Sequence, residues 1–175
     1  MVFWTSGTTG KPKGIPQANG YMRRIMEVQE GMTRPNTLPL LITGPFIHPS
    51  LFFLPLLLLF VHSSSLVFIK SHRSEAKPEE ILTAIDRHRP YKAIIIPFQM
   101  SHLATIPQET IAKLNLDSLT SIFTAGSPMF PAVEPIIKNM FPNLENISTS
   151  YGTAELGYIS SSPDLKSIGK PQKRR

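Results

Sequence analysis

The sequence predicts an α/β fold with mainly parallel sheets flanked by helices. Short apolar runs, each bounded by polar or turn residues, alternate along the chain with amphipathic stretches at helical spacing. Pro and Gly stand at several of the junctions, as in Arg89-Pro90 and Gly126-Ser127-Pro128. Because a helix between two successive strands allows both strands to run in the same direction, this alternation favours a parallel sheet.

Six short apolar runs have the character of strands, because they are brief, partly β-branched and bounded by turn residues. The expected strands are residues 1–4, 38–43, 65–69, 93–96, 121–125 and 146–150.

Four stretches have the character of helices. Pro78 suits the first turn of one helix, which Arg89-Pro90 ends, and Pro131 opens another with apolar residues at 133, 136, 137 and 140. Asn19 caps an earlier stretch that ends before Gly31, and residues 51–61 form the fourth.

Composition excludes several classes of function. The chain has no cysteine, which rules out disulfides, thiolate metal sites and a cysteine nucleophile. Its five histidines never stand three or four residues apart, so a helical zinc-protease site is not expected. The net charge of +6 suggests nucleic acid, but four of the 18 basic residues lie within the last six positions. A solvated surface is favoured, and nucleic-acid binding ranks last among the functions considered.

One apolar run raises the question of a membrane. Residues 51–61 number only 11 and include Pro55, whereas a spanning helix needs about 20 apolar residues. The amino terminus lacks the pattern of a signal peptide, and the last residues are not a peroxisomal signal. We therefore expect no membrane span and a cytoplasmic location.

The strongest local signal is the string Thr-Ser-Gly-Thr-Thr-Gly-Lys-Pro-Lys-Gly at residues 5–14, which is expected to be a loop after the first strand. Three glycines permit tight turns, four hydroxyls donate hydrogen bonds, and two lysines supply positive charge. These groups suit a polyphosphate, and the alternative is a flexible surface turn. A Walker-type loop is excluded, because Gly7 and Gly10 enclose only two residues and Pro12 follows Lys11.

Residues 5–14 resemble the phosphate loop of the adenylate-forming superfamily, which includes acyl-CoA synthetases, coumarate-CoA ligases and luciferases. Four further segments resemble motifs of that family in the same order along the chain. They are Pro45-Phe46-Ile47-His48, Gly126-Ser127-Pro128, Tyr151-Gly152-Thr153-Ala154-Glu155 and Ser167-Ile168-Gly169-Lys170-Pro171.

The resemblance implies roles for individual residues. Lys13 and Glu155 would be the catalytic pair, with Glu155 also holding Mg²⁺, and His48 would lie beside the carboxylic acid. Tyr151 would stack on adenine. The full set implied to bind ATP is Thr5, Ser6, Gly7, Thr8, Thr9, Gly10, Lys13, Gly14, Gly126, Ser127, Pro128, Tyr151, Gly152 and Thr153. Taken singly, Glu155 also fits a solvated carboxylate, Tyr151 a core residue and His48 a hydrogen-bonded histidine.

The implied function is ATP-dependent activation of a carboxylic acid to an acyl adenylate, followed by thioester formation with CoA in the complete enzyme. ATP and Mg²⁺ are the implied cofactors, and the acid, ATP and CoA are the implied partners. The alternative is a non-catalytic module that binds nucleotide or a partner. Ala154 favours this alternative, because the family places there a threonine that donates to the α-phosphate. Pro49 stands where many members have glycine.

The resemblance covers nearly the whole chain but only part of a typical member. We expect residues 1–171 to be an incomplete piece of the large N-terminal adenylation domain, and residues 172–175 to be a basic stub. The ribose-binding aspartate, the hinge and the C-terminal domain of the family have no counterpart in this sequence.

Overall fold

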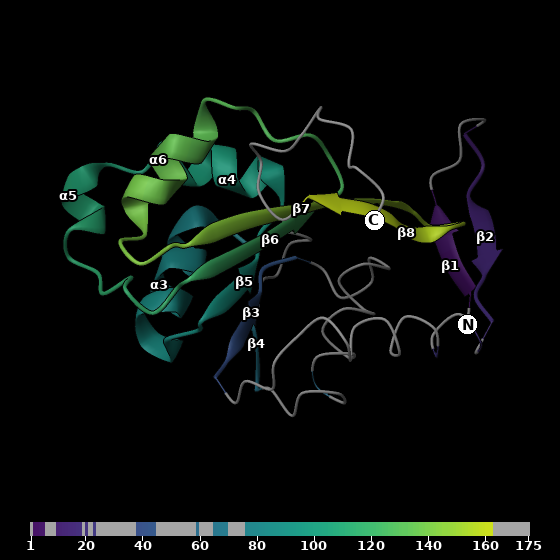
Figure 1. Ribbon diagram of the computed structural model, residues 1–175, viewed down its shortest axis with the longest axis horizontal. Helices are drawn as coiled ribbons and strands as arrows, with labels where there is room; N and C mark the ends of the chain where they lie inside the picture. Colours follow the sequence, from purple (N-terminus) through teal and green to yellow (C-terminus); the bar gives the residue numbers. More distant parts are fainter. Residues whose placement is uncertain are drawn as a thin grey trace, which may run out of the picture.

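The computed structural model describes residues 2–5, 10–18, 20, 23, 38–44, 59, 65–69 and 76–162. A hairpin is formed by β1 (Val2–Thr5) and β2 (Lys13–Pro16). The other strands are β3 (Leu40–Ile42), β4 (Leu66–Phe68), β5 (Lys92–Ile94), β6 (Ser121–Ala125), β7 (Asn146–Thr153) and β8 (Gly157–Ser162). They make one six-stranded sheet in the order β4-β3-β5-β6-β7-β8 (Figure 1).

The sheet is parallel except at one edge. β4, β3, β5, β6 and β7 all run in the same direction, and β8 returns antiparallel to β7. The described helices are α3 (Pro78–His88), α4 (Pro97–Leu103), α5 (Gln108–Ile111) and α6 (Val133–Met140). This arrangement confirms the predicted α/β class with a mainly parallel sheet.

A row of side chains across the sheet packs against the helices. Leu41, Ala93, Ile122 and Ile147 are register partners across β3, β5, β6 and β7, and all four are buried. Side chains of α3, α4 and α6 share their core cluster, among them Ile81, Leu82, Ile85, Met100, Leu103, Ile137 and Met140. A smaller cluster of Leu40, Ile42 and Ile94 lies on the opposite face. The central strands are thus buried on both faces, as parallel strands are.

Helix α3 follows its sequence signals closely. Pro78 occupies its first turn, and the Glu80 carboxylate accepts a hydrogen bond of 2.7 Å from the backbone N–H of Lys77. The helix ends where Arg89 turns into the left-handed region with φ 53°. Both predicted ends of this helix are confirmed.

Other elements depart from the prediction. The motif at residues 5–14 was expected as a loop, but Thr5 belongs to β1, and Lys13 and Gly14 belong to β2. Strand β7 continues past residue 150 to Thr153, and β8 was not expected. Helices α4 and α5 are also absent from the prediction, although Pro97, which comes after the expected strand at 93–96, occupies the first turn of α4.

Helix α6 begins at Val133 rather than Pro131, and Ile136 is 45% exposed instead of facing the core. The expected helices at 19–31 and 51–61 lie outside the described residues, apart from residues 20, 23 and 59, which are helical. Within the described ranges, no helix is long and apolar enough to cross a membrane.

Candidate active site

The carboxyl ends of the parallel strands bring together two of the predicted segments. Ala125 at the end of β6 pairs with Ser150 in β7, so Gly126 and Tyr151 follow on adjacent strands. Gly126 has φ +97°, a conformation that favours glycine, and it turns the chain out of the sheet. Residues 126–128 are exposed. Ligands of open α/β sheets bind at the carboxyl ends of the strands, so the position of these residues suits a binding site.

Strand β7 extends past the carboxyl end of β6 and carries the start of the second predicted segment, residues 151–155. An irregular register between Tyr151 and Gly152 marks a bulge, and Tyr151 is 63% exposed. Its ring therefore has an open face, and the alternative that Tyr151 is a core residue is wrong for the described structure.

The turn between β7 and β8 presents Glu155, which is exposed. The turn is stabilised by the Thr153 hydroxyl, whose oxygen accepts a hydrogen bond of 3.1 Å from the N–H of Leu156. That hydroxyl keeps its own proton for donation to another acceptor.

The hairpin β1–β2 places its polar residues on one face by strand alternation. Phe3 pairs with Ile15, and Thr5 with Lys13, so these four share a face, and Phe3 is 8% exposed. Trp4 lies on the other face and is 70% exposed. It packs over Gly14, where an added Cβ would lie 3.5 Å from the indole ring. That Cβ would lie closer to Val2 Cγ1, at 3.2 Å, so Val2 rather than the indole limits a larger residue at position 14.

A long-range hydrogen bond joins the residue after β2 to the β7–β8 turn. The Gln17 side-chain Nε2 donates to the backbone oxygen of Ala154 at 2.6 Å, across 137 positions of sequence. Gln17 directly follows β2, so this bond brings the end of that strand next to the β7–β8 turn. Figure 1 shows the hairpin at the end of the molecule away from the helices, where the β7–β8 arm reaches it. The end of β2 and the turn that carries Glu155 are therefore neighbours in space.

The donor set fits magnesium only in the presence of phosphate. Among the described residues, no group of three or more His, Asp or Glu side chains could hold a metal by itself. Mg²⁺ is commonly held by one or two carboxylates together with substrate phosphates and waters. Glu155, a single exposed carboxylate, matches that pattern.

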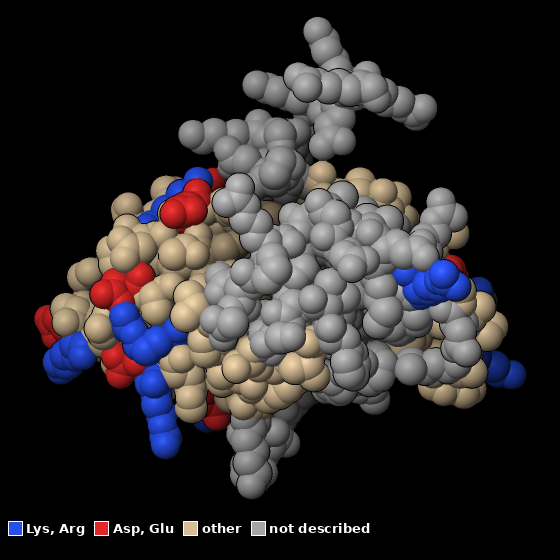
Figure 2. Space-filling model, turned by 60° about the horizontal axis from the view of Figure 1, so that its bottom comes forward, with Lys and Arg blue, Asp and Glu red and all other residues tan. Residues whose placement is uncertain are grey.

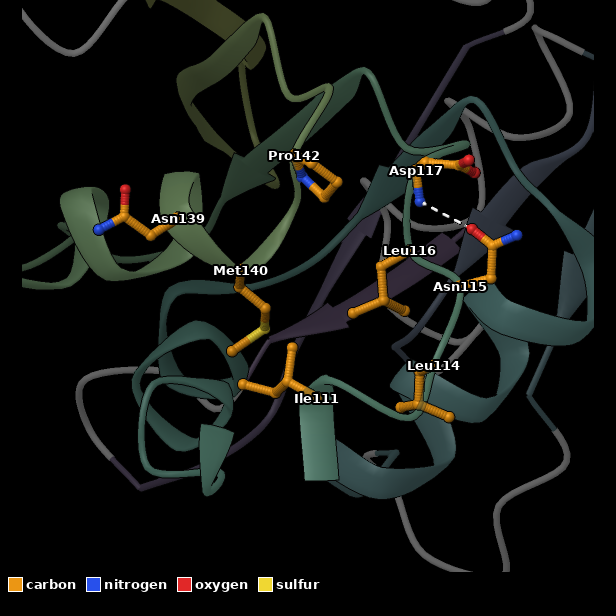
Figure 3. Close-up of a pocket in the computed structure, with 8 residues that line it drawn as sticks. All are labelled: Ile111, Leu114, Asn115, Leu116, Asp117, Asn139, Met140 and Pro142. Atoms are coloured by element: carbon orange, nitrogen blue, oxygen red, sulfur yellow. Dashed lines mark hydrogen bonds between the residues drawn. The ribbon is translucent and has the colours of Figure 1, made fainter. Parts of the chain in front are cut away.

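A cavity of about 270 Å³ lies at the other end of the sheet, where the parallel strands begin (Figure 3). Figure 3 shows Ile111, Leu116 and Met140 on its apolar side, with Asn115 and Asp117 at its rim. The Asp117 carboxylate forms an ion pair with Arg89. The predicted site residues that the structure describes do not line this cavity, so it is separate from the candidate active site.

On the face shown in Figure 2, the charged side chains of the described residues are mixed in sign. Figure 2 shows lysine, arginine and acidic side chains interspersed over the helical end of the visible face. Lys138 pairs with Glu134 at 2.7 Å on α6, one turn apart. This distribution agrees with the solvated surface predicted from the sequence.

Comparison with known proteins decides the family. The sequence model of the AMP-binding enzyme family matches residues 1–173, nearly the whole chain. The chain belongs to this family.

A curated relative is 4-chlorobenzoate–CoA ligase of Pseudomonas sp. (strain CBS-3), which is 30% identical over 158 residues, covering 89% of this chain and 28% of the ligase. A solved structure with the same fold is the luciferase-like enzyme of the mealworm Zophobas morio, with a TM-score of 0.77 and 22% identity, covering 95% of this chain and 37% of that enzyme. Another is O-succinylbenzoate coenzyme A synthetase of Bacillus subtilis in complex with ATP and magnesium, with a TM-score of 0.72 and 21% identity, covering 97% and 33%. The chain spans about a third of the length of the curated relatives it matches.

The structure describes only some of the residues that the resemblance singled out. It places Thr5, Gly10, Lys13 and Gly14 on or beside the hairpin, and residues 126–128 and 151–155 at the sheet edge and turn. Ser6, Gly7, Thr8, Thr9, His48 and residues 167–171 lie outside the described residues. Sequence reasoning missed Gln17, because a glutamine three residues after the motif carries no local signal of a partner 137 positions away.

Proposed function

We propose that this chain forms the ATP-binding part of a carboxylic acid–CoA ligase. The observation that carries the proposal is the hydrogen bond from Gln17 to Ala154, which supports a site between the hairpin and the Glu155 turn. In the complete enzyme, a carboxylate oxygen attacks the α-phosphorus of ATP, pyrophosphate leaves, and CoA then displaces AMP from the acyl adenylate.

Each residue has a defined task in this proposal. Lys13 and the hydroxyl of Thr5 compensate and bind the negative phosphate oxygens, because ammonium and hydroxyl groups are donors to phosphate. Glu155 holds Mg²⁺ jointly with the phosphates, and the metal supplies charge stabilisation when it is bound. Tyr151 stacks on adenine beside residues 126–128. Ser6, Thr8, Thr9 and His48 keep the roles implied by the family resemblance.

Ala154 changes one contact of this scheme. Its methyl group cannot donate a hydrogen bond, and its backbone oxygen is already engaged by Gln17. The neighbouring Thr153 hydroxyl has a proton left to donate, and we assign to it a donor role toward the phosphates. The second candidate function, a non-catalytic nucleotide-binding module, is favoured by the same alanine.

The chain covers only part of the length of its relatives, and this limits the activity that we propose for it alone. We propose that residues 1–171 are part of an adenylation domain and that residues 172–175 are a basic extension. Since the chain spans about a third of its curated relatives, thioester formation belongs to the complete enzyme. The acid, ATP and CoA are its proposed small-molecule partners.

Two measurements on the purified chain test the proposal. Isothermal titration should show Mg-ATP binding that Lys13→Ala and Glu155→Ala each weaken by about tenfold or more, since charge-assisted contacts contribute about 1.5–3 kcal/mol. Exposed Lys113→Ala and Glu109→Ala are matched controls that should bind as the wild type does. Unchanged binding in both site variants would contradict the assignments. Pyrophosphate exchange above a Lys13→Ala background would exclude the non-catalytic alternative.

A further inference from the structure

A buried polar cluster lies at the carboxyl ends of β3 and β5, outside the residues assigned so far. Thr43 is 3% exposed and Gln99 is 2% exposed. The Gln99 amide nitrogen donates to the backbone oxygens of Thr43 at 3.0 Å and of Ala76 at 3.4 Å. Its amide oxygen accepts from the Thr43 hydroxyl at 2.6 Å and from the N–H of Ile96 at 3.2 Å. One side chain thus connects the end of β3, the residue before α3's N-cap and the start of α4.

The orientation of this amide is set by its surroundings. Reversing it would place the oxygen against two carbonyl oxygens, where it could not bond, and the nitrogen against the N–H of Ile96. The Thr43 hydroxyl also lies 2.7 Å from the oxygen of Ile94, so its single proton serves two acceptors. We refer to Thr43 and Gln99 with these bonds as the Gln99 clamp.

The clamp lies at the carboxyl ends of the parallel strands, as the candidate active site does. Residue 126 follows β6, and residue 151 lies in β7 just past the end of β6. Thr43 follows β3, which is two strands from β6 in the order β3-β5-β6-β7. Two strand spacings are about 10 Å. A nucleotide at the ends of β6 and β7 therefore leaves the ends of β5 and β3 to the group joined to its α-phosphorus.

Burying a glutamine among backbone groups is costly unless all its hydrogen bonds are made. An apolar side chain would fill the same space between β5 and α4 without that requirement. The amide therefore restricts the backbone at Thr43 and Gly44 to one position, beyond what packing alone would require.

We propose that Gln99 is a positioning residue for the acid substrate, acting through Thr43 on the backbone where β3 ends. The inference rests on the proposed function, since it assumes that an acyl adenylate occupies this edge. Gln99 itself is buried and does not contact the substrate. The clamp is expected to affect the acyl half of the adenylate and to leave the nucleotide half unaffected.

The test compares two ligands on the full 175-residue chain. Affinities for Mg-ATP and for a non-hydrolysable acyl sulfamoyl adenosine are measured by titration for the wild type, Gln99→Leu and Thr43→Val. Thr43→Ser keeps the hydroxyl, and exposed Gln108→Leu removes an amide away from the clamp. Thr43→Val is the milder variant, because Gln99 keeps its other three bonds. Folding of each variant is checked by circular dichroism and thermal melting.

The expected result is a loss of about tenfold in affinity for the acyl analogue in Gln99→Leu and Thr43→Val, with Mg-ATP affinity within about twofold of the wild type. Thr43→Ser should restore acyl binding, and Gln108→Leu should change neither affinity. Equal loss of both ligands, or no difference between Thr43→Val and Gln108→Leu, overturns the positioning role. A wild-type chain that binds neither ligand contradicts the proposed function instead, and the positioning role is rejected with it.

Discussion

Replacing Gln17 by methionine tests whether the hairpin is held against the β7–β8 turn. Methionine keeps the length of the side chain and removes the amide that donates to Ala154 at 2.6 Å. A partly buried hydrogen bond contributes about 1 kcal/mol net, and 1.4 kcal/mol corresponds to tenfold in an equilibrium constant. The balance between the docked and undocked hairpin should therefore shift by about fivefold. Mg-ATP affinity should fall by about two- to fivefold, because only the docked hairpin completes the site.

The chain offers a readout of docking that needs no ligand. Trp4 is its single tryptophan and lies in β1, so the slow component of its fluorescence anisotropy decay reports motion of the hairpin. This residual anisotropy should decrease in Gln17→Met and remain unchanged in Gln108→Met, which alters an exposed glutamine in α5. The change in Tm should stay below about 4 °C, since about 1 kcal/mol is removed. Identical anisotropy and identical Mg-ATP affinity in the two variants would refute the hairpin–turn contact.

Three further predictions concern stability. Gly126→Ala should reduce the free energy of unfolding by about 1–3 kcal/mol in urea titration, because φ is +97° although an added Cβ would contact nothing within 4 Å. Ile85→Ala, at 0% exposure, should cost about 2–5 kcal/mol, whereas Ile136→Ala, at 45% exposure, should change stability by less than about 0.5 kcal/mol. Burial lowers the pKa of Lys92 in the folded state below its usual 10.5. Between the lowered pKa and 10.5 the folded state binds fewer protons than the unfolded state, so the free energy of unfolding rises with pH up to 10.5. Lys92→Met should therefore raise Tm at pH 7 by about 2 °C, and the advantage should shrink as the pH approaches 10.5.

Local sequence signals predicted the elements whose formation depends on neighbours along the chain. Pro78 and Arg89-Pro90 marked both ends of α3, because helix ends are decided within one turn. Residues 121–125 matched β6, and the turn at Gly126 followed from its glycine. The motifs at residues 5–14 and 151–155 were recognised without any structure, and the AMP-binding family match agrees with them.

Elements that depend on distant partners were missed or misplaced. Strand β8 exists because β7 has an unpaired side, which is a property of the sheet rather than of residues 157–162. Ile136 fits the apolar stripe of α6 but is exposed, because the packing of the helix on the sheet decides which part of a stripe is covered. Lys13 was expected in a loop, and the pairing of β2 with β1 places it on a strand.

The sequence by itself determined the α/β class, the order of most elements and the residue types of a phosphate-binding motif, since periodicity and turn chemistry act over a few residues. Only the tertiary structure decided that Gln17 meets Ala154 and that Gln99 connects Thr43 to Ala76. Those bonds join residues that are 23 to 137 positions apart. They form only after the strands have taken their order in the sheet, and no local pattern encodes that order.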